Sequence, residues 1–222
     1  MKQSAAILIL GFILGIKHAF DPDHIVAVST IIKNNRQPWK AGLIGIFWGI
    51  GHTFSLLLTG LMVLMFKINI PPKISLSLEM TVAVMLVFLG FKSVFAKEKF
   101  DHTHLHLHGK SRHAHTHDHN LDHHHGHRRS FWIGIIHGLA GSGALMILVL
   151  STIKSVSGGI YYILLFGLGS IAAMGAITVL LSLPFMFSAA RFPKLKKIMN
   201  VITGIISVVF GVIIIYEIIS IF

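Results

Sequence analysis

The sequence has no cysteine, and only 12% of its 222 residues are charged. The lack of cysteine excludes disulfide bonds, thiolate metal sites and cysteine nucleophiles together. Soluble globular domains carry charge on about a quarter of their residues, so the low charged fraction excludes that class. With 54% hydrophobic residues, the chain is predicted to be a polytopic membrane protein.

Six apolar stretches are each long enough to cross a bilayer, because a spanning helix needs about 20 apolar residues. None of them shows the apolar-polar alternation of a barrel strand, so we expect an all-α protein. The first stretch is too long for a cleavable signal peptide, and none is expected. The stretches cover residues 4–32, 41–66, 74–96, 131–152, 159–189 and 198–222.

The formal net charge of +11 raises the question of a nucleic-acid partner. The basic residues lie mostly in short loops beside the spans, where they set orientation, so we expect no nucleic acid. Thirteen of them follow the first, third and fifth spans, and four lie on the opposite side. This asymmetry predicts a multi-pass protein of the cytoplasmic membrane with those three loops in the cytoplasm and both termini outside.

A polar cluster interrupts the first apolar stretch at His18, Asp21, Asp23 and His24. Ionisable residues inside a span are functional by default. Imidazole suits nickel, cobalt, zinc and copper, and carboxylates offset the charge of a dication, so we expect a divalent-metal site. The alternative is a proline kink whose charges are satisfied by Lys17 and neighbouring helices.

Pro22 has no N–H, so it cannot bond to the His18 carbonyl, its partner four residues earlier. Asp21-Pro22 also resembles an N-cap followed by a first-turn proline. The sequence therefore predicts that the first helix is broken at Asp21-Pro22 with the His18 carbonyl free. In transporters, broken helices mark substrate sites.

An internal repeat appears when the second half is moved back by 118 to 121 residues. Three short segments then match in order, with 15–20, 48–52 and 89–91 corresponding to 134–139, 166–170 and 210–212. Three spans per half is an odd number, so the halves would be inverted in the membrane. We expect six transmembrane helices as two inverted three-helix repeats, 1–100 and 131–222, separated by a cytoplasmic loop, 101–130. Chance similarity among glycine-rich helices is the alternative.

Two further histidines belong with the cluster by depth and by repeat position. At 1.5 Å per residue, His24 lies about 13 Å from Lys33 and His52 about 18 Å from Lys40, so their levels agree. His137 is the repeat counterpart of His18, while Ser142 and Ser170 are weaker counterparts of Asp23 and His52. We therefore expect metal ligands at His18, Asp21, Asp23, His24, His52 and His137, although a lone histidine on an apolar helix is usually a core residue.

The loop between the third and fourth spans contains 12 histidines between residues 101 and 127. Its biased composition predicts a disordered segment with overlapping, weak metal sites that buffer ions. The alternative is a dispensable polar linker. The histidines concerned are His102, His104, His106, His108, His113, His115, His117, His119, His123, His124, His125 and His127.

The run from His18 to Ile25 and the Gly51-His52-Thr53 segment together resemble two signatures of the nickel/cobalt transporter family, most closely its short six-span urease-accessory nickel permeases. The first signature is a His-x4-Asp-His run, which is specific. The resemblance implies transport of Ni²⁺ or Co²⁺, with the His and Asp of the first signature essential. The third and fourth family signatures are acidic, whereas 138–143 and 166–170 carry no acid here.

We therefore expect a permease and not an enzyme, with no catalytic residues and no prosthetic group. Its transported substrate would be Ni²⁺, with Co²⁺ as a second candidate, moved most readily inward because the membrane potential gives a dication about 4.6 kcal/mol per 100 mV. A nickel or cobalt exporter is the alternative, and an intramembrane metalloenzyme or a metal sensor ranks lower. The expected partners are the ion, the lipid bilayer and, as an open possibility, a cytoplasmic metallochaperone.

Overall fold

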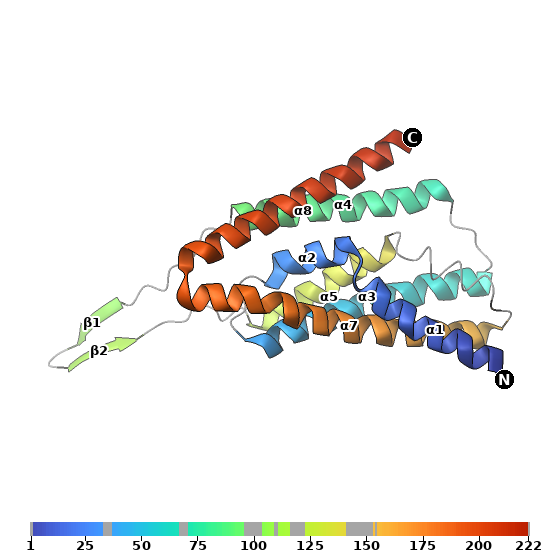
Figure 1. Ribbon diagram of the computed structural model, residues 1–222, viewed down its shortest axis with the longest axis horizontal. Helices are drawn as coiled ribbons and strands as arrows, with labels where there is room; N and C mark the ends of the chain where they lie inside the picture. The colour runs from blue at the N-terminus through green and yellow to red at the C-terminus, as the bar shows by residue number, and fades with distance from the viewer. Residues whose placement is uncertain are drawn as a thin grey trace.

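The computed structural model describes residues 2–32, 37–66, 71–95, 104–108, 111–115, 123–140, 153 and 155–221. Long helices run side by side in a bundle, and one small β-hairpin extends from it (Figure 1). The elements are α1 (Lys2–His18), α2 (Pro22–Ile32), α3 (Pro38–Phe66), α4 (Pro72–Val94), β1 (His104–His108), β2 (Ser111–His115), α5 (His123–Leu139), α7 (Val156–Arg191) and α8 (Pro193–Ile221).

Both chain termini lie at one end of the bundle, here called the terminal end, and the hairpin projects from the other, the hairpin end (Figure 1). Helices α1, α4 and α7 begin at the terminal end, whereas α3 and α8 begin at the hairpin end. The chain therefore crosses the bundle repeatedly, as a multi-pass membrane protein must.

Four helices of the described residues are long and apolar enough to span a membrane: Pro38–Met62, Pro72–Val94, Val156–Ser188 and Lys194–Ile221. They correspond to the second, third, fifth and sixth predicted spans. The first predicted span consists of two shorter apolar helices, Ala6–His18 and Pro22–Ile32. Most of the fourth, 131–152, lies outside the described residues beyond the end of α5. The membrane class is confirmed, while the count of six spans stays a prediction.

The break in the first span falls where Pro22 predicts it, because α1 ends at His18 and α2 begins at Pro22. The expected free carbonyl at His18 is wrong, since the backbone N–H of Asp21 donates a 3.0 Å hydrogen bond to it. This hydrogen bond joins residues three apart, as in a turn. It takes the place of the helical hydrogen bond that the N–H of residue 22 would have donated to the same carbonyl. The Asp21 carboxylate turns toward His18, with Oδ2 2.7 Å from Nδ1.

Part of the histidine loop has regular structure, so the expectation of disorder is wrong for the hairpin residues. Strands β1 and β2 are antiparallel, and their register pairs His104 with His115 and His106 with His113. The histidines of this segment stand at alternate positions, and alternation with a period of two is typical of a strand. The biased composition alone did not indicate this. His123, His124, His125 and His127 lie in α5, while His102, His117 and His119 lie outside the described residues.

Helix α7 packs along α1 and α3, α3 also packs against α5, and α4 pairs with α8. Glycines permit the closest crossings: a Cβ on Gly15 would overlap the backbone carbonyl of Phe166, and one on Gly134 would overlap that of Trp48. Close backbone approach through small residues is how membrane helices associate without a hydrophobic driving force.

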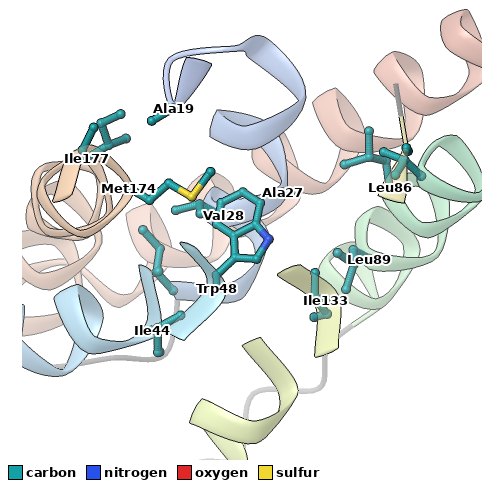
Figure 2. Close-up of a cluster of buried hydrophobic side chains, with 14 residues drawn as sticks. Ala19, Ala27, Val28, Ile44, Trp48, Leu86, Leu89, Ile133, Met174 and Ile177 are labelled. Atoms are coloured by element: carbon teal, nitrogen blue, oxygen red, sulfur yellow. The ribbon is translucent and has the colours of Figure 1, made fainter. Parts of the chain in front are cut away.

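The buried apolar residues form two clusters. The larger one includes Trp48, Val28, Met174 and Ile177, and Figure 2 shows Trp48 beside Val28 and Met174. The smaller one contains Leu56, Tyr162, Ile163 and Phe166. Tyr162 and Ile163 lie near the start of α7, so the smaller cluster is nearer the terminal end.

We expect Gly15→Ala to destabilise the folded protein by about 1–3 kcal/mol, because its Cβ meets a backbone carbonyl that has no freedom to rotate away. Gly42→Ala is the matched control, since its Cβ would meet the end of the Val179 side chain at 3.0 Å. There the helix preference for alanine, about 1 kcal/mol, offsets the contact. Thermal unfolding in detergent, followed by size-exclusion chromatography, measures both. Equal melting temperatures would contradict this account of the α1–α7 crossing.

Candidate metal centre

The break between α1 and α2 brings four polar residues of the first span to one place. His18 ends α1, and Asp23 and His24 lie in the first turn of α2. Both histidines are buried, at 4% and 1% exposure, whereas the side chains of Asp21 and Asp23 are 43% and 27% exposed. The imidazoles therefore face the interior of the bundle and the carboxylates line its more open side.

Two other helices complete the cluster. His52 of α3 is fully buried, and its Nε2 lies 3.0 Å from Nε2 of His18. His137 of α5 is 1% exposed, and its ring centroid lies 4.5 Å from that of His24. The predicted common level of His24 and His52 agrees with their 5.1 Å ring separation. Four helices thus contribute one imidazole each to a single buried cluster.

The ligand atoms fall into two groups that share one histidine. His18, His24 and His52 form the first group, and Asp23, His24 and His137 form the second, with the ligand atoms of each group within 4.8 Å of one another. The first group offers three imidazole nitrogens and the second offers two with one carboxylate, and nickel, cobalt and zinc accept both kinds of donor. His24 lies between them and could serve either.

Several ring nitrogens of the cluster are buried without a hydrogen-bond partner among the described residues: His24 Nε2, His52 Nδ1 and His137 Nδ1. A buried polar atom left unpaired costs about 1–3 kcal/mol. Moreover, Nε2 of His18 and Nε2 of His52 must share a proton or a cation at 3.0 Å, because two facing lone pairs repel. A divalent cation would satisfy these nitrogens, so the residues fit such an ion.

The two carboxylates hold the imidazoles in place. Asp23 bridges two rings, with Oδ1 3.0 Å from Nδ1 of His24 and Oδ2 2.7 Å from Nε2 of His137. The Asp21 carboxylate pairs with His18, and Asp21 lies outside both ligand groups of the described residues. A carboxylate behind an imidazole fixes its tautomer and ring orientation and raises its basicity. The geometry therefore suits Asp21 to orient His18.

Two helix C-termini point at the cluster, and the sequence predicted only the one at the Asp21-Pro22 break. His18 is the last residue of α1, and His137 lies in the last turn of α5. The last carbonyls of a helix carry partial negative charge, which favours a cation. The Gly138-Leu139-Ala140-Gly141 segment after His137 is a stop signal that could have predicted the second terminus.

Two aromatic residues that contact the histidines were also missed as site residues. The Trp48 ring lies 5.3 Å from His24 and 5.5 Å from His137, and the Phe166 ring lies 5.4 Å from His18. The sequence could have indicated Trp48, because it precedes His52 by four residues and therefore lies on the same face of the helix.

The weaker repeat counterparts have different outcomes. Ser170 is fully buried on α7, and its Oγ has no partner among the described residues. Ser142 lies outside the described residues.

Comparison with known proteins agrees with the resemblance that the two signatures carry. A family described as high-affinity nickel-transport protein matches residues 4–132. Urease accessory protein UreH of Bacillus sp. (strain TB-90) is 42% identical over 207 residues, which cover 93% of this chain and 89% of that protein. Chloroplast protein FOR GROWTH AND FERTILITY 2 of Arabidopsis thaliana is 23% identical, over 92% of this chain and 55% of its own length.

No solved structure matches the chain. The matched span contains His18, Asp21, Asp23, His24 and His52 of the buried cluster. The chain therefore belongs to the family of high-affinity nickel-transport proteins, which are membrane transporters and not enzymes.

Proposed function

We propose that the protein is a secondary permease that carries Ni²⁺ through the buried His/Asp cluster. The observation that carries the proposal is the set of four imidazoles, each at most 4% exposed, with three nitrogens that have no partner among the described residues. A similar chain is named a urease accessory protein, which supports nickel supply to a metalloenzyme as the purpose of transport.

The cluster would replace the ion's hydration shell with imidazole nitrogens and carboxylate oxygens. Imidazole favours nickel, copper and zinc over magnesium and calcium, whose preferred ligands are oxygens. The charges of Asp21 and Asp23 would balance a dication, and the two helix C-termini would add to this. Co²⁺ accepts the same ligands and is the second candidate substrate.

Uptake is the proposed direction. The excess of basic residues in the loops at the hairpin end supports a cytoplasmic position for that end, with both termini outside. The membrane potential then drives a dication inward by about 4.6 kcal/mol per 100 mV without nucleotide hydrolysis. Export, the alternative, would need coupling to proton entry.

We also propose that the bundle consists of two inverted three-helix repeats, 1–100 and 131–222, around the loop 101–130. Packing supports this, because the contact of α1 with α7 has its counterpart in that of α5 with α3. The Gly15–Phe166 crossing likewise corresponds to Gly134–Trp48. The backbone carbonyls of His18 and His137 also accept hydrogen bonds of the same kind, from the N–H three residues later. The distances are 3.0 Å to Asp21 and 3.3 Å to Ala140.

His24→Ala should abolish nickel uptake, because His24 belongs to both ligand groups. His137→Ala removes a ligand from only one group, so it should raise the nickel concentration for half-maximal uptake more than it lowers the maximal rate. Uptake of radioactive nickel into vesicles with an imposed potential measures both, and calorimetry on the purified protein measures binding. His127→Ala, in α5 but outside the two groups, is the control. Undiminished uptake by the His24→Ala protein would refute the site.

Pro22→Ala should reduce transport severalfold although every side-chain ligand remains. An N–H at residue 22 would let α1 and α2 continue as one helix and shift His18 relative to His24. Pro38→Ala is the matched control, because Pro38 also begins a helix but lies about 21 Å along α3 from His52. Full activity of the Pro22→Ala protein, measured by the same vesicle assay, would show that the break is incidental.

Deletion within the histidine loop should lower nickel supply at low metal but leave transport measurable at high metal. The deletion should remove residues 101–122 and stop there, because α5 begins at His123. Imidazoles bind metal only when neutral, so the effect should fade as the pH on the loop side falls below about 6.5. A variant with glutamine in place of the hairpin histidines keeps the loop length as a control. Loss of transport at every nickel concentration would place the loop in the transport path.

A further inference from the structure

Two aromatic rings lie directly against the histidine cluster, and each comes from a different half of the chain. Phe166 packs against His18, and Trp48 packs against His24 and His137. Both are 1% exposed. Their contacts are with the histidines that would bind the ion, so movement of either ring would uncover the site.

The two rings lie on opposite sides of the cluster along the bundle axis. The Phe166 backbone crosses Gly15 of α1, three residues before His18 on a helix that starts at the terminal end. The Trp48 backbone crosses Gly134 of α5, three residues before His137. Trp48 itself lies about 15 Å from the start of α3 at the hairpin end, and Phe166 lies about 15 Å from the start of α7 at the terminal end.

Each ring is continuous with one of the two apolar clusters. Phe166 joins Leu56, Tyr162 and Ile163 on the terminal side. Trp48 joins the cluster that contains Val28 and Met174, which lie beside it in Figure 2. A hydrated ion cannot enter such an apolar layer without losing its water. The free energy of dehydration is far larger than the free energy gained from apolar contacts. Among the described residues, each ring therefore separates the buried imidazoles from one apolar layer, and the partly exposed carboxylates of Asp21 and Asp23 lie on the remaining side.

The indole of Trp48 is held by packing and by no hydrogen bond that the described residues supply. Its Nε1 has no hydrogen-bond partner among the described residues, whereas a buried tryptophan usually finds one. Within the described part of the chain no directional bond therefore fixes its rotamer, and rotation toward a polar partner would recover the cost of the unpaired N–H.

We propose that Phe166 and Trp48 are the two gates of the permease, with Phe166 closing the cluster toward the terminal end and Trp48 closing it toward the hairpin end. The inference rests on the proposed transport function and deepens it. During transport only one ring at a time moves aside, so the ion meets one side of the membrane and then the other. Both are positioning residues, since neither offers a ligand atom to the metal.

The absence of cysteine makes a direct test available. Ser170→Cys introduces a single thiol at a fully buried position one turn after Phe166 on the same face of α7. A membrane-impermeant, cationic methanethiosulfonate is added to one side of vesicles of known orientation that contain the full chain. The labelling rate then reports access from that side.

We expect slow labelling of the Ser170→Cys protein from both sides. Adding Phe166→Ala should raise the rate from the terminal-end side by about tenfold or more, equivalent to about 1.4 kcal/mol. Adding Trp48→Ala should do the same from the hairpin-end side only. Phe166→Leu and Trp48→Phe, which keep an apolar group of useful size, should stay slow and show that the fold is intact. Phe88→Ala is the lipid-side control, because Phe88 is 62% exposed on α4.

Faster labelling from both sides in each alanine variant would indicate general loosening and overturn the proposal. No acceleration in either variant would overturn it as well. Nickel binding to the same purified proteins is measured separately by calorimetry. If each alanine variant is labelled faster from its own side only but nickel does not bind, the gates are supported and the metal site is refuted. If nickel binds but the labelling does not depend on the side, the gates alone are refuted.

Discussion

The structure depends on the burial of four imidazole rings at the centre of an apolar bundle. Inside a membrane protein no water shell is at hand to satisfy ring nitrogens, so each needs a partner from the protein or an ion. Asp21 and Asp23 partner three of the four rings, and the His18–His52 contact engages two ring nitrogens with each other. Three ring nitrogens remain without a partner among the described residues, and these are the donors that the proposed cation would use.

Close helix crossings make this cluster possible. Imidazole side chains are short, so the four helices that carry them must approach one another closely. Gly51 contributes to this, because a Cβ at that position would overlap the backbone carbonyl of Phe131 on α5. Gly138 of α5 likewise lies against the backbone of His52, where a Cβ would not fit. The glycines that look like generic membrane packing in the sequence therefore set the distances between the imidazole rings.

The two halves of the chain carry similar short segments in the same order but divide the chemistry of the cluster unequally. Both end a helix at the site with a histidine in its last turn, His18 in α1 and His137 in α5. Only the first half then supplies carboxylates and a further histidine pair, while the second supplies Ser170 where the first has His52. The donor groups of the cluster therefore come mainly from the first half of the chain, and His137 is the contribution of the second half.

The sequence by itself determined the membrane class, the break at Pro22 and the histidines of the cluster. These follow from local properties: apolar length, a missing N–H, and ionisable groups at helical spacing. Tertiary structure decided what depends on residues distant in the chain. Asp23 became a bridge to His137 and Trp48 a neighbour of two rings, because only the crossing of α2, α3 and α5 sets those distances. The hairpin likewise depends on pairing between strands, which composition alone does not encode.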